Sequence, residues 1–325
     1  MNNLIMASNI AEVNNSHGEI RAGGTDLSDR YRFGVSVGDI VDISRVPGLE
    51  DISTQADGSV KIGAKVKLGA VASDTYLIAH YPGIAMAVGT LATPQIRCMA
   101  TMGGVLLQRN RCWYFRHPAF NCFKKGGDNC PARDGDHRFG VIFDLGPCLF
   151  PHPSTVGMVL LGYEAQVEIN GERLMTIPEL YGDGSDPGHD HQLQPGDLLT
   201  GILLSAPVPD ERASYFRSMS RAEAEWALVE AGARLVVNAA DQIAMARVVV
   251  GGVANVPLRL PHVEEALIGQ PATEATFAQA AALANEGVTP LPQTGYKVPL
   301  LYGTVLETIV RAYKRVWGSE GQNSL

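Results

Sequence analysis

The stretch that decides the fold is RAGGTDLS at residues 21–28, where two adjacent glycines follow a short strand-like segment and precede a Thr-Asp pair. Glycine has no Cβ, so the backbone N–H groups of such a corner lie open to a large anionic group such as a phosphate. A second corner of the same kind, ATMGGVL, occupies residues 100–106. Neither corner has the spacing of GxGxxG or GxxxxGK[ST], so each one alone is also typical of an ordinary tight turn.

Length and composition limit the classes of protein that this chain fits. It has 325 residues, of which 46% are hydrophobic and 18% charged, with a net charge of -8. The acidic balance argues against nucleic acid or an anionic membrane as the main partner. No window approaches the length of a transmembrane helix, and the N-terminus lacks the basic segment of a secretory signal. We therefore expect a cytoplasmic protein, or a periplasmic one if a partner subunit carries the export signal.

Hydrophobic patterning predicts two regions of mixed α and β structure on either side of a loop at residues 181–197, which is rich in Gly, Asp, Pro and His. Before the loop, the pattern predicts strands at residues 18–21, 41–45, 59–64 and 167–169 and helices at residues 68–79 and 83–91. After the loop, it predicts an antiparallel sheet of three strands at residues 213–219, 227–237 and 244–250, with helices at residues 263–268, 274–284 and 299–316. The second region is therefore a separate α+β domain.

All five cysteines fall within one short part of the chain, at Cys98, Cys112, Cys122, Cys130 and Cys148. The last four have the spacing C-x9-C-x7-C-x17-C, which matches neither a CxxC zinc knuckle nor a bacterial ferredoxin. Spacing alone leaves open a metal site, loosely placed structural cysteines and disulfides, although disulfides are disfavoured in a reducing compartment. Basic residues in the same block could offset the charge of a thiolate-bound cluster or form a solvated face; they are Arg109, Arg111, Arg116, Lys124, Lys125, Arg133 and Arg138.

Six runs in order along the chain resemble the FAD-binding subunit of the molybdenum hydroxylases, the xanthine dehydrogenase and aldehyde oxidase family. They are IRAGGTDL (20–27), LATPQIRCMATMGGV (91–105), HPST (152–155), YFRSMSR (215–221), ARVVVGGVANVP (246–257) and TGYK (294–297). The resemblance implies an α+β fold with an FAD-binding domain of the vanillyl-alcohol-oxidase (PCMH) type. It divides the chain into FAD-binding subdomains at residues 1–60 and 61–208, a C-terminal α+β domain at residues 209–318, and a disordered tail at residues 319–325.

The same resemblance implies that FAD lies extended between the two subdomains with its pyrophosphate on the two glycine corners. The implied cofactor-binding residues are Ile20, Arg21, Ala22, Gly23, Gly24, Thr25, Asp26, Leu27, Leu91, Thr101, Met102, Gly103, Gly104, Val105, Thr155, Leu199 and Arg217. Three of them depart from the family pattern. Val105 stands in place of Asn, Thr155 in place of Asp, and Arg217 in place of Lys. Arginine keeps the positive charge but not the compact ammonium group.

A minority of these flavin subunits carry an inserted loop that binds a [4Fe-4S] cluster through four cysteines. The runs RCWYFR (111–116) and CFKKGGDNC (122–130) resemble the aldehyde oxidoreductase branch of that minority. The resemblance implies an insertion at residues 109–150 with Cys112, Cys122, Cys130 and Cys148 as the metal ligands. It leaves Cys98 as a structural residue near the flavin phosphates.

The implied function is electron transfer within a heterotrimer. Electrons from a molybdenum cofactor on a large subunit would pass through [2Fe-2S] clusters on a small subunit to FAD on this chain, and then to an external acceptor. No catalytic residue is expected here. The alternatives are a flavin subunit of a 4-hydroxybenzoyl-CoA-reductase-like enzyme, a standalone flavoprotein, and a zinc-stapled binding module without flavin. His189 and His191 are expected in a solvated loop, and the resemblance places Tyr296 and Lys297 near the isoalloxazine.

Overall fold

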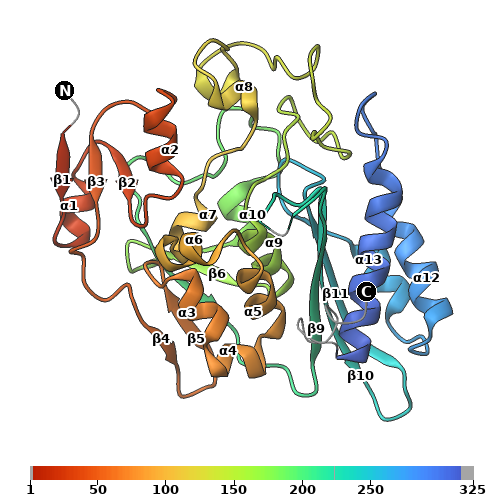
Figure 1. Cartoon of the computed structure of the whole chain (residues 1–325). Coiled ribbons are helices and arrows are strands. Elements are labelled where there is room, and N and C mark those ends of the chain that lie inside the picture. The colour runs from red at the N-terminus through yellow and green to blue at the C-terminus, as the bar shows by residue number, and fades with distance from the viewer. Residues whose placement is uncertain (1–2, 223, 316–325) are drawn as a thin grey trace.

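The molecule contains three β-sheets that lie one after another across it. Figure 1 shows the N-terminal sheet, then a central sheet covered by several short helices, and then the C-terminal sheet. The computed structural model describes residues 3–222 and 224–315. The predicted disordered tail at residues 319–325 lies outside the described residues. Within the described part of the chain, no helix is long and apolar enough to cross a membrane.

The N-terminal lobe is a parallel sheet in the order β1-β3-β2, and it carries the first glycine corner. Its elements are β1 (Leu4–Met6), α1 (Ile10–Asn14), β2 (Glu19–Arg21), α2 (Leu27–Arg32) and β3 (Ile40–Asp42). Parallel neighbours need crossover connections, and α1 and α2 supply them. Val13, Val41 and Ile43 form a small core that also receives Leu198 from the central lobe. This contact fixes the N-terminal lobe against the central one.

The central lobe is built on an antiparallel sheet in the order β4-β5-β8-β6-β7. Its strands are β4 (Ile52–Thr54), β5 (Val60–Gly63), β6 (Gln166–Ile169), β7 (Arg173–Thr176) and β8 (Leu199–Leu204). Its helices are α3 (Leu68–Ser73), α4 (Thr75–His80), α5 (Pro82–Gly89), α6 (Pro94–Met99), α7 (Met102–Leu106), α9 (Thr155–Gly162) and α10 (Ile177–Tyr181). Strand β4 pairs with β5 and not with the N-terminal strands, so the chain changes sheets between Asp42 and Ile52.

Residues 109–150, here called the cysteine segment, leave the central lobe after α7 and return to it before α9. The described regular structure in this segment is limited to α8 (Trp113–Arg116) and the 3-10 turn η1 (Phe123–Lys125). Figure 1 shows the segment as a protruding yellow loop region above the sheets. Its conformation therefore depends on side-chain contacts more than on a backbone hydrogen-bond ladder.

The C-terminal lobe is an antiparallel sheet in the order β12-β11-β10-β9, with helices on its outer face. Its elements are β9 (Arg212–Ser218), β10 (Val229–Val237), β11 (Ile243–Gly251), β12 (Leu258–Arg259), α11 (Pro261–Leu267), α12 (Glu274–Ala282), η2 (Leu283–Asn285) and α13 (Lys297–Lys314). Leu301, Val305 and Ile309 recur every four residues on α13 and are fully buried. Such spacing puts them on one helix face, which packs against β9 and β10. Helices α5 and α9 cover the opposite face of the sheet.

The α+β class with two mixed regions is confirmed, while several element predictions need correction. The C-terminal sheet has four strands, because the short β12 joins β11. The helix predicted at residues 68–79 is two helices, because the Asp74 side chain accepts a hydrogen bond from the Leu77 amide (2.9 Å) and starts α4. The sequence also suggests that Thr25 and Asp26 cap a short helix, but the Asp26 side chain makes no cap hydrogen bond to α2 and pairs with arginines instead.

Candidate cofactor site

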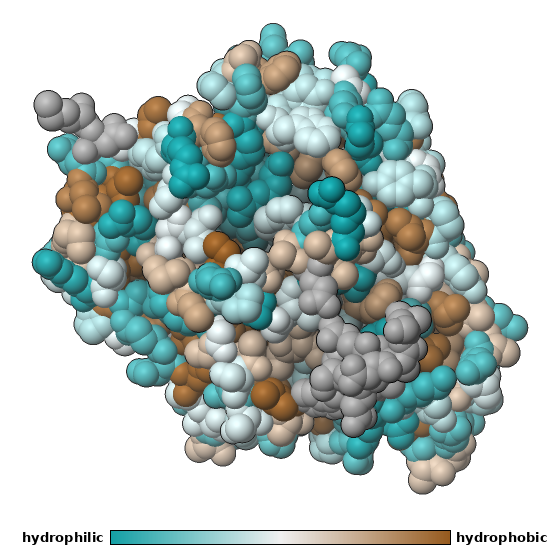
Figure 2. Space-filling view, in the orientation of Figure 1, coloured by the Kyte–Doolittle hydropathy of each residue, from teal (hydrophilic) through white to brown (hydrophobic). Residues whose placement is uncertain are grey.

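A cavity of about 790 Å³ lies between the N-terminal and central lobes, and both glycine corners line it. Figure 2 shows hydrophilic residues gathered in a hollow on this face, where α2 and α7 approach the cysteine segment. Twelve predicted cofactor-binding residues line the cavity: Ile20, Arg21, Ala22, Gly23, Gly24, Thr25, Asp26, Leu27, Thr101, Gly103, Gly104 and Leu199. The structure thus brings together three segments that are far apart in the sequence. We call this space the flavin cavity.

The first corner is a tight turn with unused hydrogen-bond donors. A Cβ on Gly23 would overlap the carbonyl oxygen of Met99, so only glycine allows this close approach to the segment before the second corner. Gly24 has a φ of +71°, in the left-handed region that favours glycine. The N–H groups of Gly23, Gly24 and Thr25 have no acceptor among the described residues. The corner therefore offers backbone donors to an anionic ligand.

The second corner leaves space in the cavity, but the backbone N–H groups of its two glycines are already hydrogen-bonded. The Gly103 amide donates to the Ala64 carbonyl (2.8 Å), and the Gly104 amide donates to the Thr101 hydroxyl (3.2 Å). A Cβ on Gly103 would lie 3.0 Å from the Cβ of Ala64, so glycine lets α7 pack tightly against the chain after β5. The two corners thus have different roles in one cavity: the first supplies donors, and the second leaves room.

The arginines that line the cavity are paired with carboxylates. Arg21 Nε lies 2.6 Å from Asp42 Oδ2, and Arg30 Nε lies 3.1 Å from Asp26 Oδ2. Arg109, which the sequence assigned only to the basic block, also lines the cavity. Pairing holds the guanidinium groups at fixed positions along the wall, where they offset the charge of the neighbouring carboxylates.

The loop around the H-D-H run closes one side of the cavity, which the sequence did not predict. His189 is 72% exposed, as expected for a solvated loop, but the Asp190 side chain is only 5% exposed and lies 2.5 Å from Arg109 and 2.7 Å from Lys124. Burial alone would raise the pKa of Asp190, but Lys124 and Arg109 outweigh it and hold the pKa well below its usual range. Burial lowers the pKa of His191 to about 4. The prediction of a solvated loop therefore holds for His189 and is wrong for the neighbouring Asp190 side chain.

Five predicted cofactor-binding residues do not line the flavin cavity. Met102 and Val105 are buried in the central core, and Leu91 packs against the same core. The Thr155 hydroxyl donates to Glu230 Oε2 (2.8 Å), and Arg217 stands opposite Glu230 in the β9–β10 register.

Thr155 and Glu230 line a second cavity of about 360 Å³, whose wall also includes Arg111, Trp226 and Lys297. The Tyr215 hydroxyl donates to the same Glu230 oxygen (2.6 Å). Burial raises the pKa of Glu230 against the opposing effect of these donors. The structure thus groups Thr155 with a buried carboxyl that sequence patterns gave no reason to single out.

Tyr296 and Lys297 hold the cysteine segment against the C-terminal lobe. The Tyr296 hydroxyl donates to the Arg138 carbonyl (2.8 Å). Lys297 Nζ donates to the carbonyls of Phe139 (3.1 Å) and Gly252 (2.8 Å), and burial lowers its pKa to about 7. These contacts make both residues positioning residues for the segment.

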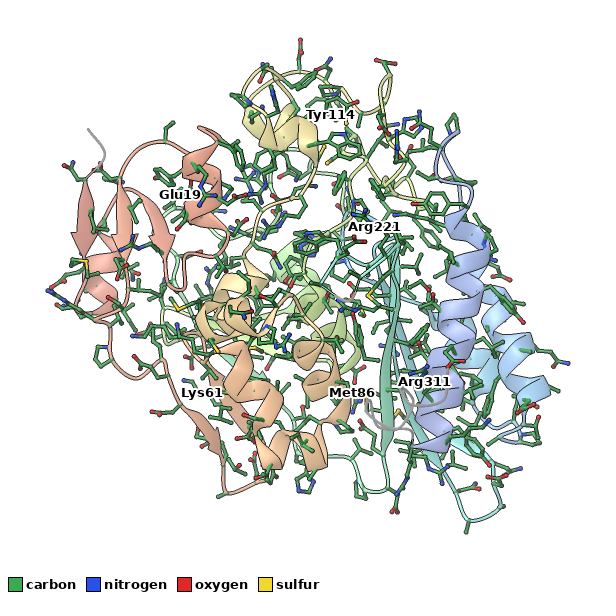
Figure 3. The ribbon with its side chains drawn as sticks, viewed as in Figure 1. Glu19, Lys61, Met86, Tyr114, Arg221 and Arg311 are labelled. Carbon is green, nitrogen blue, oxygen red and sulfur yellow. The ribbon has the colours of Figure 1, made fainter. Side chains whose placement is uncertain are left out.

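The four clustered cysteines converge on one small space, here called the cysteine cavity. Its lining includes Cys112, Cys122, Cys130 and Cys148, together with Lys124 and aromatic side chains. Figure 3 labels one of these, Tyr114, in the segment above the sheets. All five cysteines of the chain, each within the described residues, are free thiols, so the disulfide alternative is not supported. Cys98 is exposed on α6 and lines neither cavity, which corrects the expectation of a structural residue near the flavin phosphates.

The thiols suit a soft metal in number and kind, but the described residues include no group of three or more His, Cys, Asp or Glu side chains in metal-binding geometry. Burial raises the pKa of Cys112 to about 12 and also raises that of Cys148. Four cysteine side chains around one cavity are the donors that a four-thiolate site uses, and the bound group is a proposal.

Two family models cover almost the whole chain. A model described as "FAD binding domain in molybdopterin dehydrogenase" matches residues 3–207, and one described as "CO dehydrogenase flavoprotein C-terminal domain" matches residues 214–314. The chain belongs to this family of flavin subunits. It is an oxidoreductase subunit with an FAD-binding domain, as the sequence motifs predicted.

Individual relatives agree with this membership. The aldehyde oxidoreductase FAD-binding subunit PaoB of Escherichia coli (strain K12) is 30% identical over 247 residues, which cover 74% of this chain and 76% of that protein. The 6-hydroxypseudooxynicotine dehydrogenase complex subunit alpha of Paenarthrobacter nicotinovorans is 23% identical over 305 residues. The match covers 91% of this chain and 87% of that protein.

A solved structure of quinoline 2-oxidoreductase from Pseudomonas putida 86 shares the fold, with a TM-score of 0.75 at 19% identity. The match covers 97% of this chain and 98% of that one. A carbon monoxide dehydrogenase from Hydrogenophaga pseudoflava has a TM-score of 0.76 at 18% identity, with the same coverage. These two likenesses concern the fold alone.

Proposed function

We propose that this chain is the FAD- and [4Fe-4S]-binding electron-transfer subunit of a heterotrimeric, molybdenum-dependent aldehyde oxidoreductase. The observation that carries the proposal is the pairing of two sites on one chain. The glycine corners line one cavity of flavin size, and four cysteines line a second, smaller cavity. The 30% identity to an aldehyde oxidoreductase subunit favours an aldehyde over other substrates.

The residues of the flavin cavity fit an extended dinucleotide. The free N–H groups of Gly23, Gly24 and Thr25 would bind the diphosphate, with Gly103 and Gly104 leaving room beside it. Leu199 from β8 lines the same cavity and would lie along the cofactor. Thr155 and Arg217, beside Glu230, would act at the far end if the cofactor extends toward the second cavity. Bound FAD would supply the exchange of electrons between the partner subunits and an external acceptor.

The proposed ligands of the cluster are Cys112, Cys122, Cys130 and Cys148. Four thiolates suit either an iron–sulfur cluster or zinc, and resemblance to the cluster-bearing branch favours iron and sulfide. Lys124 lies in the same wall and would offset part of the negative charge. The large molybdenum subunit and the small [2Fe-2S] subunit are the proposed partners, and export to the periplasm would depend on one of them.

Anaerobic mixing with an aldehyde tests the proposal. We expect the flavin absorbance to bleach when the chain is assembled with its partners and to stay unchanged when the chain is alone, because no residue here performs the aldehyde chemistry. Bleaching of the isolated chain would contradict the proposal and favour a standalone flavoprotein. When the assembled complex is given a low-potential electron donor, reduction of the flavin followed by reduction of an aromatic acyl-CoA would favour the reductase alternative.

A further inference from the structure

Asp26 connects the flavin cavity to the cysteine segment. Its carboxylate is 11% exposed and lines the flavin cavity. Oδ1 lies 2.6 Å from Arg116 Nη2 and 3.0 Å from Arg111 Nη1, while Oδ2 accepts from the Arg109 amide (3.0 Å). Arg30 from α2 adds a contact within the N-terminal lobe. Most partners of this buried charge thus come from the start of the cysteine segment.

The same residues surround the first predicted metal ligand. The Arg116 amide donates to the Cys112 carbonyl (2.9 Å), and Arg116 Nη2 donates to the Arg109 carbonyl (2.8 Å). The Cys112 amide in turn donates to Asn110 Oδ1 (2.6 Å). A change in the position of Cys112 would therefore move the guanidinium groups that neutralise Asp26.

A second connection joins the other wall of the flavin cavity to the same segment. Asp190, in the loop that closes that wall, is paired with Lys124 on η1, between Cys122 and Cys130. It is also paired with Arg109. Both walls of the flavin cavity are thus held by charges from a segment with little regular structure of its own.

We propose that metal binding in the cysteine cavity raises the affinity of the flavin cavity for FAD, through neutralisation of Asp26. The inference rests on the proposed function, because it needs both groups to bind. Without metal, the thiols do not cross-link the segment, and Arg111 and Arg116 are held less firmly beside Asp26. Asp26 is then a poorly neutralised buried anion beside the site of a diphosphate, and like charges at close range repel. With metal bound, the arginines cancel that charge.

If the charge of Asp26 couples metal binding to FAD affinity, the variant Asp26→Asn, which removes this charge, should remove the coupling. In the full chain with its partner subunits, FAD affinity is measured by flavin fluorescence before and after iron is removed with a chelator. We expect iron removal to weaken FAD binding about tenfold in the wild type, within the usual range of coupling between sites. In Asp26→Asn the two affinities should agree within about twofold, and the iron-free variant should bind FAD more tightly than the iron-free wild type.

Two further variants separate this mechanism from general damage. Arg116→Gln should weaken FAD binding even with iron present, because Asp26 loses one of its neutralising partners. The matched control is Arg311→Gln on α13, which pairs with Glu307 away from both cavities (Figure 3) and should keep the wild-type tenfold ratio. Equal FAD affinities in iron-loaded and iron-free wild type would overturn the inference, as would a wild-type ratio that persists in Asp26→Asn.

Thermodynamic linkage between FAD binding and iron binding supplies a second measurement, which does not need an iron-free folded protein. If iron strengthens FAD binding, FAD must strengthen iron binding by the same factor. Saturation with FAD should therefore lower the dissociation constant of the metal, measured by competition with a chelator, about tenfold in the wild type and leave it unchanged in Asp26→Asn. No effect of FAD in the wild type would overturn the coupling alone. A chain that binds no FAD or no iron would overturn the proposed function and the coupling together.

Discussion

The flavin cavity and the cysteine cavity lie side by side but are built in opposite ways. The flavin cavity is framed on one side by strand and helix ends, namely β2, α7 and β8, and is closed on the other side by the loop before β8. Backbone packing fixes the positions of Gly23 and Gly103 in this frame. The cysteine cavity is framed by a segment whose described regular structure is one turn of helix and one 3-10 turn. A cavity framed by regular elements keeps its shape without a ligand, whereas the order of a loop-built cavity depends on what its thiols hold.

Because of this difference, we expect the two cofactors to contribute differently to the stability of the folded chain. FAD would bind to a site already shaped for it, so its loss should leave the lobes folded. The metal would hold together residues 109–150, so its loss should loosen this segment and the charges that it presents to Asp26 and Asp190. The following changes test the contrast, beginning with the largest effect.

Replacing Cys122 with Ser should abolish iron binding, because a cluster of this type needs four thiolates. The chain should still fold and take up FAD at saturating concentration. Iron and acid-labile sulfide assays with a flavin spectrum measure both outcomes. Cys98→Ser is the matched control, because Cys98 is exposed on α6 outside the cysteine cavity, and should keep full iron content. Loss of iron in the control with retention in Cys122→Ser would contradict the ligand assignment.

Replacing Gly23 with Val should produce the reverse pattern. The added side chain overlaps the Met99 carbonyl, so the corner must move, at a cost of about 1–3 kcal/mol in folding free energy. We expect FAD content below about a tenth of wild type, with iron retained. Gly303→Ala on α13 meets no atom within 4 Å and should leave FAD content unchanged. Normal FAD binding in Gly23→Val would show that RAGGTDLS is an ordinary turn.

Sequence reasoning was most successful where backbone geometry requires a particular residue type. The glycine corners and the order of α and β elements were predicted, because glycine positions and periodicity are local signals. Arg109 and His191 were missed as parts of the flavin cavity, because their role depends on a loop folding back over a distant segment. Glu230 was missed for a similar reason, since its contact with Thr155 spans 75 residues. Motif resemblance placed Thr155 and Arg217 with the cofactor, and their contribution there remains a proposal.

The smallest effect concerns His152, which follows the cysteine segment and packs on Tyr181 at 4.1 Å between ring centroids. Burial lowers the pKa of His152 from 6.5 to about 4. The unfolded chain therefore binds a proton that the folded chain excludes between pH 6.5 and 4, so stability falls as the pH falls through this window. From pH 7 to 5 the loss attributable to His152 is about 2 kcal/mol.

Urea unfolding of wild type and His152→Asn at both pH values measures this loss, which should be smaller in the variant. His17→Asn, at an exposed position, is the control and should keep the wild-type pH dependence. An unchanged pH dependence in His152→Asn would show that other buried groups, such as His191, account for the loss of stability at low pH.

Cofactor content of the anaerobically purified chain tests the central claim most directly. An absorbance spectrum, combined with assays of iron, zinc and acid-labile sulfide, shows which group each cavity holds. The account predicts one flavin with about four iron and four sulfide per chain, as a cluster bound by four cysteines requires. Flavin with zinc or without metal would contradict the cluster and keep the family assignment. No flavin in folded protein co-expressed with its partners would contradict the flavin site itself.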